Sequence, residues 1–265
     1  MSNFQYLSAS ALDEAAAKVK GAQDGALLAG GMTLLPSIKL GLSDPSDIVD
    51  LAGIGDLSGI DVEGGSVTIG AMTRHAEVAG SSEVATAIPA LAALTGGIGD
   101  LQVRNRGTIG GSVANNDPAA DYPAACLALG ATINTDQRSI SADDFFTGLF
   151  ETALGEGEIV TSVSFPTPDK AAYQKFTNPA SRYALIGVFV AFGSDGVRVA
   201  VTGCGQGGVY RESGLEEALG GDFSAGSLDG KTVSSDNLMS DIHAAADYRA
   251  HLIVEMAKRA VAACG

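Results

Sequence analysis

The sequence predicts an α+β protein of two domains, because short apolar runs with frequent glycine turns give way to long alternating runs and a final helix. The short runs fill the first 168 residues. From residue 169 onward the apolar residues alternate over longer stretches, and the last seventeen or so have helical periodicity. Pro166 and Pro168 mark the boundary. We therefore expect domains at 1–168 and 169–265, with the first divided into subdomains of about 1–55 and 56–168.

The first subdomain is predicted to be a small βαβ-like unit. Leu12–Val19 has apolar residues at helical spacing, and Ala26–Ala29 and Asp47–Leu51 have the composition of buried strands. Two glycines end the first of these strands, and Thr33 follows as the N-cap of a short helix. Free amides at such a helix start favour an anion.

The second subdomain is predicted to alternate short strands and helices. We expect strands at Val67–Ala71, Ala131–Asn134, Arg138–Ser141 and Ile159–Phe165. Helices are expected after Thr73, which would be the N-cap, at Ile88–Leu94, near Pro123–Leu129 and at Asp143–Phe150. Between them, Arg104–Ala124 is expected to be a glycine-rich loop, around which the chain is organised.

The C-terminal domain is predicted to hold a three-stranded antiparallel sheet backed by helices. The strands are expected at Ala172–Phe176, Leu185–Phe192 and Val197–Thr202, and the helices at Ser213–Leu219 and Asp247–Ala263. Gly193–Gly196 has the length and composition of a hairpin turn.

Two glycine-containing segments are candidate phosphate sites, Ala29–Thr33 and Gly107–Ser112. Glycine lacks a Cβ, so a phosphate can approach the backbone amides closely. Their spacing matches neither the dinucleotide-binding fingerprint nor the Walker loop. Together the two segments suit a diphosphate, while an ordinary glycine-rich loop is the alternative interpretation of the second.

Composition excludes several classes of function. A formal charge of −15 argues against nucleic acids and anionic membrane surfaces. No apolar run approaches a membrane span, and the first residues do not resemble a signal peptide, so we expect a cytoplasmic protein. Three widely spaced cysteines cannot supply four thiolates to an iron–sulfur cluster, and the three histidines lack the spacing of metal ligands. We expect no metal site and no catalytic side chain.

The sequence resembles the FAD-binding (medium) subunit of the molybdenum hydroxylases, a family that includes aerobic carbon monoxide dehydrogenase and xanthine dehydrogenase. The resemblance rests on Ala29–Thr33 with Leu35-Pro36 and Lys39-Leu40, and on Arg104–Gly111 and Asp117–Pro123. It implies a two-subdomain FAD-binding domain of the PCMH (vanillyl-alcohol oxidase-like) type, followed by a C-terminal flavoprotein domain.

The resemblance also implies the residues that bind FAD. Those around the diphosphate are Ala29, Gly30, Gly31, Met32 and Thr33 in one segment and Thr108, Ile109, Gly110, Gly111 and Ser112 in the other. Asp121 would accept a hydrogen bond from the cofactor, and Lys175, Tyr183, Ile98 and Val160 would lie at the isoalloxazine ring. The alternatives are a helix cap for Asp121, a solvated Lys175, and ordinary packing for the other three.

The function that the resemblance implies is electron transfer. Electrons would pass from [2Fe-2S] clusters of a small partner subunit through non-covalent FAD to an external acceptor, NAD or a quinone. Molybdopterin would be bound by a large partner subunit, and the three subunits would assemble as a dimer of heterotrimers. A free-standing FAD-dependent oxidoreductase and a non-redox nucleotide-binding module are the alternatives.

Overall fold

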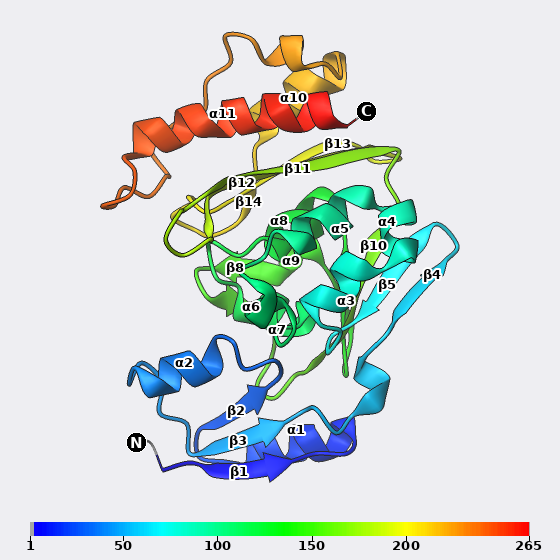
Figure 1. Ribbon diagram of the computed structural model, residues 1–265, viewed down its shortest axis with the longest axis vertical. Helices are drawn as coiled ribbons and strands as arrows, with labels where there is room; N and C mark the ends of the chain where they lie inside the picture. Colours follow the sequence, from blue (N-terminus) through cyan, green and yellow to red (C-terminus); the bar gives the residue numbers. More distant parts are fainter. Residues whose placement is uncertain (1–2, 265) are drawn as a thin grey trace.

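The computed structural model describes residues 3–264, and the chain forms three stacked parts (Figure 1). A small sheet with two helices lies at one end, a larger sheet with most of the short helices lies in the middle, and a third sheet covered by a long helix lies at the other end. The predicted α+β class is confirmed.

The first part is a parallel sheet in the order β1-β3-β2. Its elements are β1 (Gln5–Ser8), α1 (Leu12–Gly21), β2 (Gly25–Leu28), α2 (Leu34–Lys39) and β3 (Asp47–Asp50). The predicted helix and both predicted strands are confirmed. Strand β1 was not predicted, because no residue of this edge strand is buried and no apolar alternation marks it.

The middle part is an antiparallel sheet in the order β4-β5-β10-β6-β7. Its strands are β4 (Ile60–Glu63), β5 (Ser66–Gly70), β6 (Thr132–Thr135), β7 (Ser139–Ser141) and β10 (Val160–Pro166). The four predicted strands are confirmed. The added strand, β4, is an edge strand with no buried residue.

Seven short helices, a 3-10 turn and a small hairpin accompany this sheet. They are η1 (Gly55–Leu57), α3 (His75–Gly80), α4 (Ser82–Ala87), α5 (Pro89–Gly96), α6 (Leu101–Arg104), α7 (Ile109–Asn115), α8 (Tyr122–Ala128), α9 (Ala142–Phe145), β8 (Phe146–Gly148) and β9 (Glu151–Thr152). Together with the sheet they enclose the largest apolar cluster of the described chain.

The prediction of one continuous loop over Arg104–Ala124 is wrong, because this stretch contains α7 and the start of α8. Thr108 caps α7, and its Oγ1 accepts the Gly111 amide at 3.2 Å. Two glycines lower the helix propensity of this segment. Gly110 is nevertheless required in α7, since a Cβ there would lie 2.4 Å from the Cβ of Ala71. Close packing on the sheet overrides the propensity.

The prediction that Thr73 caps the next helix is also wrong. Its hydroxyl donates to the Gly59 carbonyl and accepts the Gly59 amide, and Arg74 occupies the N-cap position of α3. Thr33 does precede α2 as predicted, but its side chain makes no capping hydrogen bond.

The last part is a sheet in the order β11-β12-β13-β14. Its elements are β11 (Lys170–Thr177), β12 (Ala184–Gly193), β13 (Gly196–Thr202), β14 (Tyr210–Arg211), α10 (Ser213–Gly221), η2 (Ala225–Leu228) and α11 (Ala246–Ala263). The three predicted strands, the hairpin between β12 and β13, and both helices are confirmed. The two-residue β14 adds a fourth strand that is too short for a periodic signal.

The central strand β12 is buried on both faces. Val188 and Val190 pack toward α11, and Phe189 and Ala191 enter the central cluster with the helices of the middle part. The domain boundaries near 55 and 168 stay a proposal, since one apolar cluster spans the second of them. None of the described helices is both long and apolar enough to cross a membrane.

Candidate functional site

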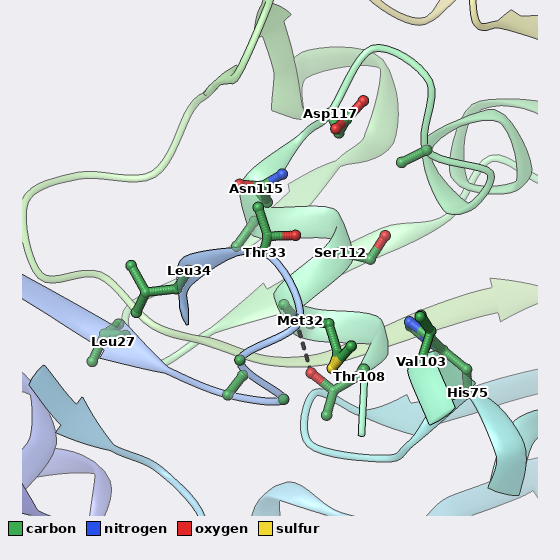
Figure 2. Close-up of a pocket in the computed structure, with 18 of the residues that line it drawn as sticks. Leu27, Met32, Thr33, Leu34, His75, Val103, Thr108, Ser112, Asn115 and Asp117 are labelled. Atoms are coloured by element: carbon green, nitrogen blue, oxygen red, sulfur yellow. Dashed lines mark hydrogen bonds between the residues drawn. The ribbon is translucent and has the colours of Figure 1, made fainter. Parts of the chain in front are cut away.

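A pocket of about 560 Å³ lies between the first part and the middle part, within the size range of small-molecule sites. We call it the main pocket. The loop between β2 and α2 forms one wall, and α7 and the segment before β10 form others. Figure 2 shows Thr33 from the loop and Ser112 and Asn115 from α7 facing the same space.

Free amides line the first wall. Within residues 3–264, the backbone N–H groups of Gly30–Leu34 donate to no acceptor. Gly31 has a φ of +73°, a conformation that glycine adopts readily, and this turns the chain sharply after β2. Position 30 requires glycine for a different reason, because a Cβ there would lie 2.1 Å from the Arg106 carbonyl oxygen. A concave row of unpaired amides is a site for an anion.

The second segment does not offer such a row of free amides. The amides of Ile109 and Gly110 donate to the Thr73 and Ala71 carbonyls, and those of the next two residues donate to Thr108. The groups left without a partner in the described chain are the Thr108 amide and the Ser112 hydroxyl. Most amide donors of this segment are therefore used by hydrogen bonds that attach α7 to its neighbours or form its first turn.

The structure gathers most of the predicted site residues at the main pocket. Those that line it are Ala29, Gly30, Gly31, Met32, Thr33, Ile98, Thr108, Gly110, Gly111, Ser112, Asp121, Val160 and Tyr183. Ile109 does not line it, since its side chain is fully buried in the central cluster. Lys175 does not line it either.

Lys175 and Asp121 bind each other. The Lys175 Nζ atom lies 2.9 Å from Asp121 Oδ2, and the Tyr173 hydroxyl donates to Oδ1. Burial raises the pKa of the Asp121 carboxyl, and Lys175 and Tyr173 oppose that shift. Asp121 occupies the N-cap position of α8 without a capping hydrogen bond. Each carboxylate oxygen already has a donor within the chain, so the acceptor capacity left for a ligand is reduced.

Tyr183 lies at the mouth of the main pocket, in the turn between β11 and β12. Its side chain is 46% exposed. The turn is closed by the Asn178 amide, which donates to the Tyr183 carbonyl, and by the Arg182 amide, which donates to the Asn178 carbonyl. Burial, followed by the nearby Asp117 and Asp121 carboxylates, raises the pKa of the Tyr183 hydroxyl. The Tyr183 hydroxyl therefore stays protonated, and so uncharged, beside the opening of the main pocket.

Sequence reasoning missed an apolar lining and one histidine. Leu27, Leu34, Leu51 and Ile159 line the main pocket, and Figure 2 shows the first two on one side of it. His75 lies on the other side, and burial, with a smaller contribution from Arg104, lowers its pKa to about 4. No local signal marks these residues, because strands and helices far apart in the sequence bring them together.

The fold and the pocket define a nucleotide-cofactor-binding protein, with free amides for a phosphate group between apolar surfaces for rings. Residues 2–168 match the family described as "FAD binding domain in molybdopterin dehydrogenase". The chain belongs to this family, the FAD-binding subunits of the molybdenum hydroxylases, and the predicted resemblance is confirmed.

Relatives match over nearly the whole chain. The chain is 33% identical over 274 residues to the carbon monoxide dehydrogenase medium chain of Hydrogenophaga pseudoflava, which covers 97% of this chain and 96% of that one. It is 32% identical over 278 residues to the nicotine 6-hydroxylase medium subunit of Paenarthrobacter nicotinovorans, with 98% and 97% covered.

Solved structures agree. Carbon monoxide dehydrogenase from Hydrogenophaga pseudoflava matches with a TM-score of 0.90 and 32% identity, over 99% of this chain and 97% of that one. Quinoline 2-oxidoreductase from Pseudomonas putida 86 matches with a TM-score of 0.87 and 28% identity, over 98% and 96%. The predicted combination of an FAD-binding domain with a further domain of sheet and helices is confirmed.

The residues present fit FAD, a molecule with a ring system at each end and a diphosphate between them. The free amides of Gly30–Leu34 lie in the middle of the main pocket and suit the diphosphate. Figure 2 shows Leu27 and Leu34 to one side of this loop and Val103 to the other. Apolar surface is thus available for a ring on both sides of the anion site.

Proposed function

We propose that the chain is the FAD-binding electron-transfer subunit of a molybdenum hydroxylase complex. The observation that carries the proposal is the row of free amides at Gly30–Leu34, at the centre of a pocket that is apolar on both sides, in a chain of this family. Electrons would come from [2Fe-2S] clusters of a partner subunit and leave to an external acceptor, NAD or a quinone. FAD, when bound, supplies the exchange between single electrons and electron pairs.

The chain's own residues would bind the cofactor mainly through dipoles. Of the described residues that line the main pocket, Arg182 carries the one cationic side chain, while Asp117, Asp121 and Glu158 carry carboxylates. The diphosphate charge would therefore be stabilised by the amides of the β2–α2 loop, with the Thr108 amide and the Ser112 hydroxyl opposite. No side chain of either segment offers a covalent attachment, which supports non-covalent FAD.

Aromatic and apolar side chains would hold the isoalloxazine ring. Ile98 and Val160 line the main pocket, and Tyr183 stands at its mouth, where an electron acceptor would approach. Lys175 would influence the cofactor indirectly, through Asp121, because its ammonium group is paired with that carboxylate. These roles rest on the position of each residue at the pocket.

The remaining cofactors and the partners are part of the same proposal. A molybdopterin-binding large subunit and a [2Fe-2S] small subunit would complete a dimer of heterotrimers. Relatives named as medium chains or medium subunits, matched over nearly their full length, support this. A cytoplasmic location also belongs to the proposal, and the free thiols of Cys126, Cys204 and Cys264 are compatible with a reducing compartment.

The test is the composition and reactivity of the purified full chain. We expect one FAD per chain, bound directly or taken up on titration, together with reduction by dithionite and no iron or molybdenum. An aldehyde, a purine or carbon monoxide should not reduce the isolated chain, and reduction should appear once both partner subunits are added. A chain that binds no flavin contradicts the proposal, and substrate-dependent reduction of the metal-free chain would favour a free-standing oxidoreductase.

A further inference from the structure

His75 is a buried polar side chain whose ring has no hydrogen-bond partner in the described chain. It is the first residue of α3, is 4% exposed, and lines the main pocket. Nδ1 is sealed inside the protein without a partner. Nε2 has no partner either, and it is the ring nitrogen that is not sealed. Figure 2 shows a nitrogen of this ring at the end that faces Met32 and Ser112.

The backbone at Gly107 leaves a space that fits the imidazole ring of His75. A Cβ at Gly107 would lie 2.6 Å from Nε2 and 2.8 Å from Cδ2 of His75, so only glycine leaves room for the ring. The His75 amide donates to the Gly107 carbonyl at 2.9 Å. On the other side, the Tyr122 ring packs against the imidazole with centroids 5.4 Å apart. The absence of a side chain at Gly107 thus makes room for the imidazole, and these contacts fix His75 in the wall of the main pocket.

The protonation state makes Nε2 a donor. With a pKa lowered to about 4, the ring is neutral near pH 7 and carries one proton. A buried N–H group without an acceptor is rarer in proteins than an unpaired acceptor. Placing the proton on Nε2 leaves the sealed Nδ1 as the unpaired acceptor and directs the N–H group into the main pocket.

We propose that His75 binds the flavin nucleotide directly, donating from Nε2 to an oxygen of its ribityl–diphosphate portion. The choice of this portion follows from the neighbours, because the ring faces Met32 and Ser112 and adjoins Gly107, which directly precedes Thr108. Phosphate and ribityl oxygens are both acceptors for a neutral N–H group. This inference rests on the proposed function and adds to it a side-chain contact from α3, outside both glycine segments.

The test compares FAD titrations of the full wild-type chain, His75→Phe and His75→Gln, followed by flavin fluorescence. Phe keeps a flat ring without a donor, whereas the Gln amide reaches close to the position of Nε2. Loss of a hydrogen bond to a ribityl oxygen should raise the Kd of His75→Phe roughly two- to tenfold, and loss of one to the charged diphosphate roughly ten- to hundredfold. His75→Gln should recover part of the loss. His251→Phe, at an exposed position on α11, should leave the Kd unchanged.

Fragments of the cofactor separate the two acceptor groups. If Nε2 donates to the diphosphate, His75→Phe should also weaken ADP and leave riboflavin unchanged. If it donates to the ribityl chain, riboflavin should weaken and ADP should not. Unchanged affinities for FAD, ADP and riboflavin in a folded His75→Phe chain overturn the inference.

A measurement on the wild-type chain guards against a variant that fails to fold. In ¹⁵N-histidine-labelled chain, FAD should shift the Nε2 resonance of His75 and slow exchange of its proton, with Nδ1 remaining unprotonated. An unchanged His75 spectrum in a chain saturated with FAD overturns the inference and leaves the proposed function standing. A wild-type chain that binds no FAD overturns both.

Discussion

The ammonium group of Lys175 lies 2.9 Å from Asp121 Oδ2, in a pair whose side chains are 10% and 5% exposed. Lys175 belongs to β11, and Asp121 precedes α8, so the pair links the last sheet to the loop that borders the main pocket. Thr202 on β13 adds to the link, since its hydroxyl donates a hydrogen bond shared between the Pro118 and Ala120 carbonyls. The last sheet therefore helps to fix the shape of the pocket.

Removing Lys175 should destabilise the chain. Lys175→Met leaves the Asp121 carboxylate buried without its cation, which typically costs about 3–5 kcal/mol. Urea unfolding of the full chain measures this. The double variant Lys175→Met with Asp121→Asn should recover part of the loss, because it removes the buried charge as well. Lys170→Met, on the exposed end of the same strand, is the control, and equal effects at both lysines would show that the ion pair carries no stability.

Glu158 should make stability depend on acid pH. Its carboxylate accepts from Arg138, Thr135 and the Gly155 amide, and these contacts lower its pKa from 4.5 to about 2. A lowered pKa in the folded state means that the stabilisation is present above the unfolded value and is lost as pH falls from about 4.5 toward 2. The contribution at neutral pH is about 3 kcal/mol.

Glu158→Gln should remove this dependence. The difference in unfolding free energy between wild type and variant should be largest at pH 6 and should shrink by pH 3. Glu156→Gln, at a neighbouring exposed position, should behave as wild type throughout. A difference that does not change between pH 6 and pH 3 would mean that the lost contacts are not those of the ionised carboxylate.

Two glycines of the pocket should respond differently to substitution. Gly30→Ala should destabilise the fold, because its Cβ would meet the Arg106 carbonyl oxygen of the backbone. Gly111→Val should instead reduce FAD binding in a folded chain, since a Cβ there meets only the Thr108 hydroxyl and the Ala29 methyl, at 3.0 and 3.4 Å. Thermal unfolding and FAD titration separate the two effects, with Gly80→Ala as the control in open space. Full FAD occupancy in Gly111→Val would place the diphosphate away from α7.

The sequence predicted best where periodicity is strong. The strands β11–β13 and the helix α11 are long and apolar on a regular pattern, so they were found within a few residues of their ends. The edge strands β1 and β4 bury nothing and left no pattern. Helix α7 was missed because packing of Gly110 on Ala71 decides its conformation, and packing is not visible in local composition.

The site was predictable as far as its motifs reach. The two glycine segments and Tyr183 do border one pocket, as the resemblance implied. The pairing of Lys175 with Asp121, 54 residues apart, and the seat of His75 against Gly107 depend on how the elements pack. Neither relationship has a signature in the order of residues.

Tyr183 should control access to the flavin more than affinity for it. Its half-exposed ring at the mouth of the main pocket contributes aromatic contact worth ~0.5–1.5 kcal/mol, so Tyr183→Ala should weaken FAD about tenfold or less. The flavin absorption spectrum and the rate of reoxidation should change more, because the variant opens the face that an acceptor approaches. Stopped-flow reoxidation and FAD titration measure the two effects, and Tyr248→Ala, a similarly exposed tyrosine on α11, is the control. An unaltered spectrum and reoxidation rate in Tyr183→Ala would mean that the turn between β11 and β12 does not cover the flavin, and that the tyrosine only packs against the protein surface.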